Sequence, residues 1–404
     1  MITLANNILA YGGSIVPLHI TDVEELKNRG ISNPSIVKHN GKNLVCFRSC
    51  DYTFFMSNRP LLSEHKLMWY PVDQPSAHTK FNSRNVICEM DENCKLLNPK
   101  MFMTETGDNK FNGYEDIRLS SYNGTLYASA SHPNGNSIPI RICKLNSEYE
   151  IESYDEYGGE GAIEKNWMPV LDREGVFVYL APERVVKAEN GTLTDIRNEK
   201  GLETFRGSSQ LVPYTLNGRD GYVCIVHRSV IERSDAFYVI NYYHKFLFFD
   251  KGFSLINVSD WFKFAGMPVE FTCGLMIEDG IVTLPFSLMD SYPVVAKFGT
   301  ELIDDILLRR YKTVECDCNI NNRIGDITRK ICECAIEDGT DNYAAKIAMS
   351  TYLAANAKNR EEAVGMYEHT LEILKYFNNG QSNWYLHQLL FQDQIIEQIK
   401  ILKS

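Results

Sequence analysis

Five stretches of the chain share one plan, and this repeat constrains the fold more than any other feature of the sequence. Each has an apolar strand, a turn of Asn-Gly, Glu-Gly or Asp-Gly, and a second apolar strand. This pattern is typical of β-hairpins. The hairpins are NPSIVKHNGKNLVCFR from Asn33, DIRLSSYNGTLYASAS from Asp116, WMPVLDREGVFVYLAP from Trp167, QLVPYTLNGRDGYVCIVH from Gln210 and TCGLMIEDGIVTLPFS from Thr272.

These hairpins are apolar in the middle and mostly polar at their open ends. Sheets repeated around an axis give this pattern, because the ends of their inner strands line a central channel. The units start 83, 51, 43 and 62 residues apart, which is enough for about four strands each. We therefore predict an all-β five-bladed β-propeller from Asn33 to about Val314. A β-sandwich built from the same hairpins is the alternative.

The C-terminal part of the chain has a helical pattern. Apolar residues recur at i, i+3, i+4 and i+7 in the stretches 341–358, 359–377 and 383–403. We predict a propeller domain over residues 1–315 and an α-helical C-terminal domain of about four helices over 316–404. The apolar stripes of these helices would pack against the propeller, form a short helical stack, or contact a second copy or a partner.

Composition and charge narrow the class of protein. The chain of 404 residues is 44% apolar and 23% charged, as in ordinary globular proteins. Its net charge of −11 argues against a general affinity for nucleic acid. The first residues lack the pattern of a signal peptide, and no run of 18 apolar residues occurs. We expect a cytoplasmic protein without a membrane span.

The 11 cysteines indicate reduced thiols, since their number is odd and most stand in apolar, strand-like runs. Cys316, Cys318, Cys332 and Cys334 together resemble a four-thiolate metal site. However, Cys332 and Cys334 fall in an expected helix, where residues i and i+2 point to different sides. We favour buried free thiols there, and expect neither a metal nor a cofactor.

Charged and polar residues at the hairpin ends and nearby are candidates for a functional site. They are Arg48, Glu115, Asp116, Arg118, Glu164, Lys165, Asn166, Arg206, His227, Arg228, His244, Glu270 and Asp290. Burying several cations together is costly unless anions balance them. Either the carboxylates pair with all of these cations, or the site binds an anion such as phosphate.

A channel that presents both carboxylates and cations suits a sugar bonded to phosphate. Carboxylates bind hydroxyls and transfer protons, while cations hold the phosphate. Trp167, Tyr114 and Tyr243 offer flat apolar faces for a sugar ring. Gly207 and two serines follow Arg206, which would allow a phosphate to approach closely.

The order of short motifs resembles a known family. NPSI, CFR, YEDIRL, EKNW, RGSSQ, VHR, YYHKF, EFTCGL and FSLMDS occur in the order found in the β-mannoside phosphorylases of glycoside hydrolase family 130. They resemble still more closely the related glycosyltransferase-like propellers, which include the mannosyltransferase-phosphorylases of glycosyltransferase family 108. The resemblance covers roughly residues 30 to 300 and leaves out the helical tail.

The resemblance implies a propeller whose central cavity acts on mannosides or related sugars with inversion. It implies that Asp116, in the YEDIRL motif, delivers the catalytic proton, and that Asp290 contacts the sugar. The positions that would hold phosphate or an activated donor are Arg48, Lys165, Arg206, His227 and Tyr243. From their placement we add sugar contacts at Glu115, Arg118, Asn166, Trp167 and Glu270. Arg118 stands two residues from Asp116 on the same strand face, where it can position that carboxylate.

Two departures from the family pattern favour sugar transfer over simple phosphorolysis. Ile117 stands where the hydrolase family has Pro, and the EKNW and YYHKF motifs are spelled as in the transferase-like branch. The sequence therefore favours an inverting glycosyltransferase that moves mannose or a similar sugar from a sugar phosphate or nucleotide sugar to a glycan-type acceptor. Two alternatives stay open: a β-mannoside phosphorylase that uses inorganic phosphate, and a catalytically silent propeller that binds a glycan or nucleotide sugar.

Overall fold

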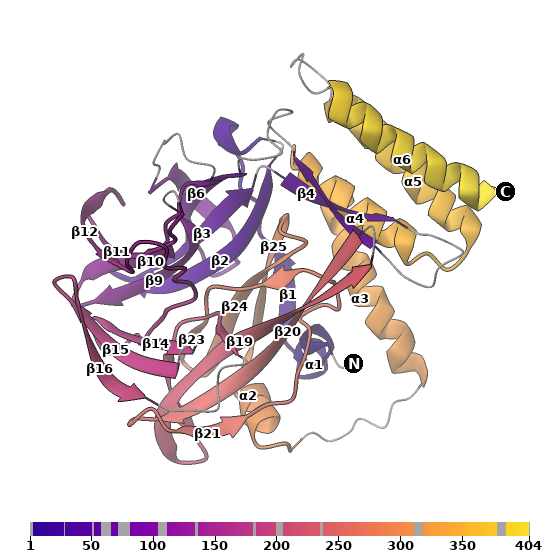
Figure 1. Ribbon diagram of the computed structural model, residues 1–404. Helices are drawn as coiled ribbons and strands as arrows, with labels where there is room; N and C mark the ends of the chain where they lie inside the picture. The colour runs from indigo at the N-terminus through magenta and orange to yellow at the C-terminus, as the bar shows by residue number, and fades with distance from the viewer. Residues whose placement is uncertain are drawn as a thin grey trace.

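The computed structural model shows a five-bladed β-propeller with helices on one side (Figure 1). It describes residues 3–27, 29–50, 52–57, 66–71, 81–103, 111–133, 136–180, 183–198, 205–234, 237–310, 318–377 and 385–403. Five separate antiparallel sheets surround a common centre, and each of the five hairpins lies in a different sheet. The propeller prediction is thus confirmed, and the sandwich alternative is wrong.

The first three blades follow the chain in order. Blade 1 contains β2 (Gly30–His39), β3 (Lys42–Cys50), β6 (Phe81–Met90) and β7 (Leu96–Met101), with β8 (Phe111–Asn112) parallel to β6. Blade 2 contains β9 (Glu115–Tyr122), β10 (Thr125–Ser131), β11 (Ile140–Leu145) and β12 (Ile151–Tyr157). Blade 3 contains β13 (Met168–Pro169), β14 (Val176–Leu180), β15 (Glu183–Glu189) and β16 (Thr192–Asn198).

The last two blades close the ring. Blade 4 contains β17 (Arg206–Gly207), β18 (Val212–Leu216), β19 (Arg219–Ser234), β20 (Phe237–Asp250) and β21 (Leu255–Val258). Blade 5 contains β22 (Glu270–Phe271), β23 (Met276–Glu278), β24 (Ile281–Leu288) and β25 (Tyr292–Gly299). Its outer strand is β1 (Ser14–Pro17), which pairs with β25. The propeller therefore begins before Asn33, because the N-terminal strand completes the last blade.

The turn residues explain why the hairpins form. Asn40 has φ 48° and Gly41 φ 80°, and Asn217 and Gly218 have φ 50° and 79°. Two successive left-handed residues make the tight turn that matches the twist of paired strands, and Asn and Gly adopt this conformation most readily.

One buried glutamine ties the blades together at the centre. The Gln210 side-chain amide donates to the carbonyls of Ile36 and Leu119, both at 2.9 Å, and its carbonyl accepts from Leu275 N–H at 2.9 Å. These bonds join blade 4 to blades 1, 2 and 5. The chains approach so closely that a Cβ on Gly274 would lie 2.5 Å from the Ile36 nitrogen. The polar end of the fourth hairpin thus serves the fold.

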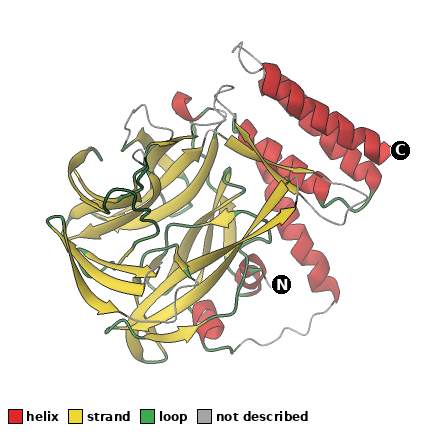
Figure 2. Cartoon of the chain, in the orientation of Figure 1, coloured by secondary structure: helices red, strands yellow, loops and turns green. Residues whose placement is uncertain are grey.

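The long helices form a layer beside the propeller (Figure 2): α3 (Cys318–Glu337), α4 (Tyr343–Ala355), α5 (Arg360–Phe377) and α6 (Tyr385–Lys403). The short helices are α1 (Leu4–Ala10), η1 (Glu24–Leu26) and α2 (Glu301–Leu307), of which α1 and α2 contact strands of the last two blades. Residues of α3 and α4 share one hydrophobic core with blades 4 and 5, while α5 and α6 pack with α4 in another. The expected packing against the propeller is therefore present. The predicted boundary at 315/316 lies outside the described residues.

A two-stranded hairpin links the propeller to this helical layer. It consists of β4 (Tyr52–Ser57) and β5 (Lys66–Pro71), between β3 and β6 in the chain. β4 contacts α4, and β5 contacts β20 toward the end of that strand that lies near the helical layer (Figure 1).

The cysteines that resembled a metal site do not form one among the described residues. Cys332 is buried beside Met349, whereas Cys334 is exposed, as expected for two positions on one helix. Cys316 and the side chain of Cys318 lie outside the described residues. Within the described part of the chain, no group of three or more potential ligand side chains gathers. None of the described helices is long and apolar enough to cross a membrane.

Candidate active site

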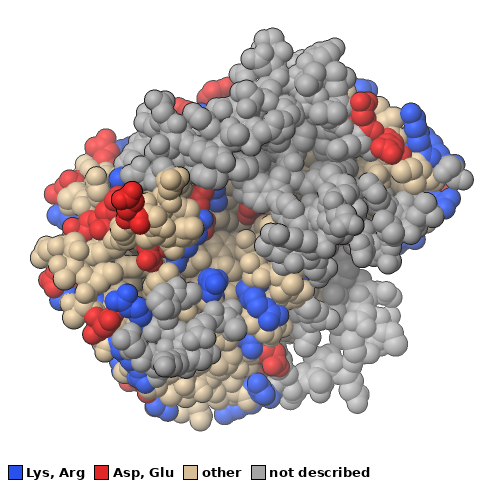
Figure 3. Space-filling view, viewed as in Figure 1, with Lys and Arg blue, Asp and Glu red and all other residues tan. Residues whose placement is uncertain are grey.

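A cavity of about 310 Å3 lies where residues of all five blades converge. We call one set of its lining residues the polar half: Asn33, Arg48, Glu115, Asp116, Lys165, Asn166 and Asp290. We call a second set the apolar half: Phe54, Ile240, Tyr242, Val269 and Phe271. His227 completes the described lining. Figure 3 shows this side of the molecule hollowed near its middle, with both basic and acidic side chains at the rim.

Asp116 stands at the centre of the polar half in a left-handed backbone conformation, with φ 54°. Its Oδ1 accepts a hydrogen bond of 2.7 Å from the Asn33 side-chain amide. Asn33 is itself left-handed, with φ 50°, and its backbone N–H donates to Ser287 Oγ. Asp and Asn tolerate this conformation better than most residues. The side chains of blades 1, 2 and 5 thereby set the position of one carboxylate.

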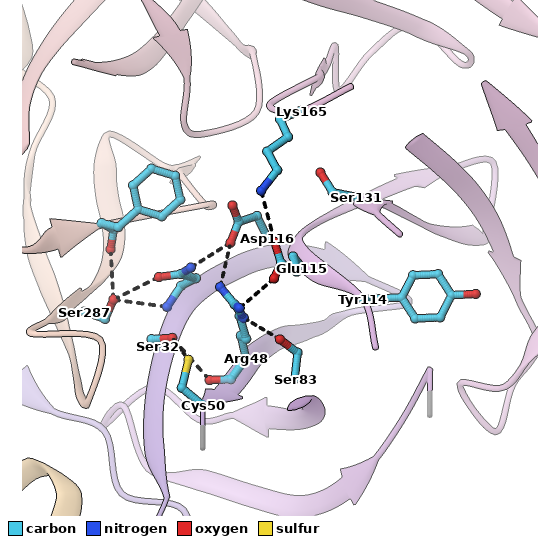
Figure 4. A network of polar contacts seen from close by, with 12 residues as sticks. Ser32, Arg48, Cys50, Ser83, Tyr114, Glu115, Asp116, Ser131, Lys165 and Ser287 are labelled. Carbon is cyan, nitrogen blue, oxygen red and sulfur yellow. Dashed lines mark hydrogen bonds and ion pairs between the residues drawn. The ribbon is translucent and has the colours of Figure 1, made fainter. Parts of the chain in front are cut away.

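Two cations surround the carboxylates of blade 2 (Figure 4). Arg48 Nη2 lies 2.8 Å from Glu115 Oε1, and Arg48 Nη1 lies 3.8 Å from Asp116 Oδ1. Lys165 Nζ reaches Glu115 Oε2 at 3.2 Å, and Arg48 Nε donates to Ser83 Oγ. The structure therefore brings together the carboxylate–cation pairs that the sequence analysis considered.

The electrostatics of this network favour an ionised Asp116. Burial alone would raise the pKa of the Asp116 carboxyl group. The charges of Arg48, Lys165 and Arg118, together with the hydrogen bond from Asn33, outweigh burial and lower that pKa below its ordinary value. At neutral pH, Asp116 is thus a charged base with cations on its flank.

Arg118 acts from behind the cavity. It is only 2% exposed and donates to the Asp116 backbone carbonyl at 2.9 Å and to the Ser208 carbonyl at 2.7 Å. It also reaches the Gly207 carbonyl and Asn166 Oδ1. Arg118 therefore positions the main chain at Asp116 and is not among the lining residues, although we expected it to contact the sugar.

His227 is neutral over the physiological pH range. Burial, with the nearby charges of Arg118 and Arg206, lowers the pKa of His227 to about 3. Its Nδ1 is 2.9 Å from Ser208 Oγ, and its ring stacks on Tyr242 and meets Phe271 edge-on. A neutral imidazole at this place can donate or accept a hydrogen bond, but it adds no positive charge to a phosphate site.

Like Arg118, four further residues given a role from the sequence are not among the lining residues, and neither are the candidates Tyr114, Glu164, Arg228 and His244. Trp167 is buried between blades 2 and 3, against Tyr157 of β12 and Phe177 of β14. Arg206 is exposed beside His227 on the neighbouring strand. Tyr243 lies over Lys263, because successive residues of β20 point to opposite faces and Tyr242 takes the cavity side.

Glu270 is the fourth, and its carboxylate serves the main chain. It accepts N–H bonds from Phe264, Ala265 and Met267 at 2.6 to 2.8 Å and is completely buried. Burial, which outweighs these bonds and the charge of Lys263, raises the pKa of Glu270 to about 7. Its role is to hold the loop that precedes Val269.

Six of the described lining residues were not proposed from the sequence as site residues: Asn33, Phe54, Ile240, Tyr242, Val269 and Phe271. Asn33 stands in the NPSI motif at the position that Asp116 occupies in the second hairpin, so the repeat itself marked it. Tyr242 differs from the proposed Tyr243 by one residue of register. No pattern in the sequence marked Phe271 as a site residue, since an aromatic residue beside Glu270 is typical of an ordinary core position.

The apolar half depends on the helical layer. Phe54 lies on β4, which contacts α4, and it shares a hydrophobic core with Val269 and with residues of α3 and α4. Thr328 of α3 donates to the Ala265 carbonyl, in the loop that Glu270 holds. The cap residue of α4, Asn342, donates to the Ser291 carbonyl next to Asp290. The helices thus support the cavity wall at three places.

Comparisons with known proteins find similarity in structure. No protein-family model matches the sequence, and no curated protein matches it. Similar solved structures include a β-1,2-mannobiose phosphorylase from Listeria innocua, with 13% identity and a TM-score of 0.47 over 73% of this chain and 97% of that one. A mannose phosphorylase from Leishmania mexicana has 12% identity and a TM-score of 0.44, over 72% and 91%.

A GDP-mannose-dependent mannosyltransferase from Leishmania mexicana is also similar, with 11% identity and a TM-score of 0.43 over 71% of this chain and 89% of that one. These proteins are of the classes that the motifs resemble. At such identities the likeness concerns the fold alone, so the chemistry has to be argued from the residues of this chain.

Proposed function

We propose that this protein is an inverting glycosyltransferase that moves mannose or a similar sugar from a sugar phosphate or nucleotide sugar to a hydroxyl group of an acceptor. The observation that carries the proposal is the carboxylate of Asp116, which residues of several blades hold beside a cation in a cavity that presents hydrogen-bonding groups. An ionised carboxylate within reach of a hydroxyl is a general base. Sugar transfer to an alcohol needs such a base.

The bonds change in one displacement step. Asp116 takes the proton of the acceptor hydroxyl while the oxygen of that hydroxyl attacks the anomeric carbon of the donor sugar. The bond from that carbon to the phosphate oxygen breaks, and its electron pair leaves with the phosphate. Inversion requires the entering and leaving oxygens to be roughly in line across the anomeric carbon.

The cations have different places in this reaction. Lys165 is only half-buried, and its ammonium group contacts Glu115 in the described structure, so it can turn toward a donor phosphate. Arg48 is bonded to Glu115 and Ser83 and lies beside Asp116. Arg48 therefore lies on the same side of the cavity as Asp116, where it stabilises the charged base.

A β-mannoside phosphorylase is the second candidate, and the same cations favour it. In phosphorolysis Asp116 has to be protonated, because it must give a proton to the departing sugar oxygen. Inorganic phosphate bound to Arg48 and Lys165 would offset the two charges that lower the Asp116 pKa. The two candidates thus differ in the protonation state that Asp116 needs when the substrate arrives.

A thermal-shift screen across sugar phosphates, nucleotide sugars and inorganic phosphate identifies the donor, since a ligand that binds the native state raises Tm. Steady-state kinetics of Asp116→Asn then test the role of the carboxylate. Asn keeps the shape and the left-handed backbone but cannot take a proton. We expect kcat to fall by about two to four orders of magnitude.

Asp279→Asn is a matched control, because Asp279 is an exposed left-handed aspartate in the turn of the fifth hairpin, with φ 50°. Near-normal turnover of Asp116→Asn would remove the proposal. Donor binding by the wild type without any turnover would instead point to a silent binding protein.

A further inference from the structure

The apolar half of the cavity has a composition that a sugar does not require. Two of its residues, Ile240 and Val269, are aliphatic, and Phe54 and Phe271 have no hydrogen-bonding group. The polar half of the same cavity already offers carboxylates, amides and cations to the hydroxyls of a sugar. Among the described lining residues, one set thus satisfies hydroxyl groups, while in the other only Tyr242 has a polar side-chain group.

Three of the five residues of the apolar half come from parts of the chain added to the basic four-stranded blades, whereas Tyr242 and Phe271 lie on the blade strands β20 and β22. Phe54 belongs to the β4–β5 hairpin, which forms a two-stranded sheet of its own. Ile240 lies in the part of β20 beyond its pairing with the site residue His227. Val269 ends the loop that Glu270 and α3 hold. Three separate additions therefore present nonpolar groups to one space.

Tyr242 lies where the two halves of the cavity meet. Its ring packs against His227 and Phe271, whereas burial and the charges of Asp290 and Asp116 raise the pKa of its hydroxyl. That hydroxyl stays protonated and lies toward the carboxylates. Beyond it the apolar wall offers no partner from Phe54, Ile240, Val269 or Phe271.

We propose that the acceptor or leaving group, which is bonded to the reacting sugar in the product or the substrate, carries a short alkyl chain or a single aromatic ring. The apolar half receives this nonpolar part. This inference rests on the proposed function. A second sugar in that place would press hydroxyl groups against aliphatic carbon, and each unpaired hydroxyl would cost affinity. An alkyl group would gain affinity with every methylene removed from water.

Calorimetric titration of the full chain with a series of alkyl β-mannosides tests the proposal. The probes are methyl, propyl, butyl and hexyl mannoside, with β-1,2-mannobiose as the polar comparison. We expect affinity to rise roughly two- to fourfold per methylene until the cavity is filled, as burial of a CH2 group predicts. Butyl mannoside should bind more tightly than the disaccharide.

Ile240→Thr keeps a β-branched side chain but replaces apolar surface with a hydroxyl. In this variant the gain per methylene should fall to below half of the wild-type value, while methyl mannoside binds as before. Ile196→Thr is the matched control, since Ile196 is an exposed isoleucine on β16 and 46% accessible. The control should keep the full gain.

The outcomes separate this inference from the function on which it rests. Two results would overturn this inference and leave the proposed function intact. In the first, methyl mannoside binds but affinity does not rise along the alkyl series; in the second, mannobiose binds more tightly than butyl mannoside. A gain that Ile240→Thr leaves intact also overturns it, because the alkyl chain then lies elsewhere. If no glycoside or sugar phosphate binds at all, the proposed function falls and this inference falls with it.

Discussion

The two halves of the cavity are built in different ways. The polar half comes from the ends of the repeated hairpins and from residues directly beside them, with Asn33 and Asp116 at equivalent positions of blades 1 and 2. The apolar half comes from an inserted hairpin, an extended strand, a loop and the short strand β22, and the hairpin and the loop contact helices. A repeated motif thus supplies the groups that do chemistry, while added segments decide what else fits beside them.

Two buried carboxylates show the same contrast. Asp116 has cations around it, and its pKa is lowered, whereas burial raises the pKa of Glu270 to about 7. Asp116 therefore contributes stability that is present above its ordinary pKa and lost as pH falls through the lower native value. Glu270 contributes stability that is present below pH 4.5 and lost as pH rises through 7. The polar and apolar halves respond to pH in opposite directions.

The largest effect should come from Arg118, which holds the polar half from behind. Arg118→Ala leaves the carbonyls of Asp116, Gly207 and Ser208 without their donor in a buried place. Urea denaturation should show a loss of about 3–5 kcal/mol in the free energy of unfolding. Arg219→Ala is the control, since Arg219 forms an exposed pair with Asp250 and its loss should cost at most about 1 kcal/mol. Equal effects of the two variants would contradict this role.

The second effect concerns pH and the loop of the apolar half. Because the native pKa of Glu270 exceeds its ordinary value of 4.5, the native state binds the proton more tightly. Between pH 5 and pH 8 the free energy of unfolding should therefore decrease by up to about 3 kcal/mol through this group. In Glu270→Gln that slope should disappear, while Glu278→Gln, at an exposed position paired with Lys38, should retain it. The same slope in both variants would exclude Glu270 as the cause.

Asn342 tests whether the helices support the cavity. Its side chain accepts from Ala345 N–H at the start of α4 and donates to the Ser291 carbonyl next to Asp290. Asn342→Ala should lower the free energy of unfolding by about 1–2 kcal/mol, as for the loss of a helix cap. Donor affinity should fall as well, because Asp290 loses its support. Unchanged donor affinity in a destabilised variant would show that the helices act on stability alone.

The smallest effect should separate two adjacent tyrosines. Tyr242 lines the cavity and Tyr243 does not, so Tyr242→Phe should weaken glycoside binding roughly two- to tenfold, the loss of one hydrogen bond. Tyr243→Phe should leave it unchanged. Titration of both variants with methyl mannoside gives the comparison, and a larger effect at Tyr243 would mean that the register of β20 is reversed.

The sequence predicts the fold through local signals and the site only in part. Turn residues such as Asn40 and Gly41 indicate the hairpins, and the number and spacing of these hairpins predict five blades. Asp116 and Arg48 follow from their places at hairpin ends. Trp167 and Glu270 also stand beside polar or aromatic residues in the sequence, but the direction of Trp167 depends on packing between blades 2 and 3, and that of Glu270 on its bonds to the loop 264–267.

The apolar half could not be predicted in this way. Phe54, Ile240 and Val269 are ordinary strand or loop residues, and only the folded chain brings them to one cavity, over separations of up to about 200 residues. Such long-range packing leaves no local pattern. Ring closure by the N-terminal strand was missed for the same reason, since β1 pairs with β25 at the other end of the propeller.

The most direct test of the account is the dependence of kcat/KM on pH, with the nucleotide sugar or sugar phosphate that the screen selects and a hydroxyl acceptor. An Asp116 that is ionised before substrate binds predicts a rate that stays level between pH 5 and pH 7 in the wild type, with Asp116→Asn lower by at least about a hundredfold throughout. A wild-type rate that rises steadily from pH 7 to pH 5 would contradict this, because the reacting form of Asp116 would then be the protonated acid.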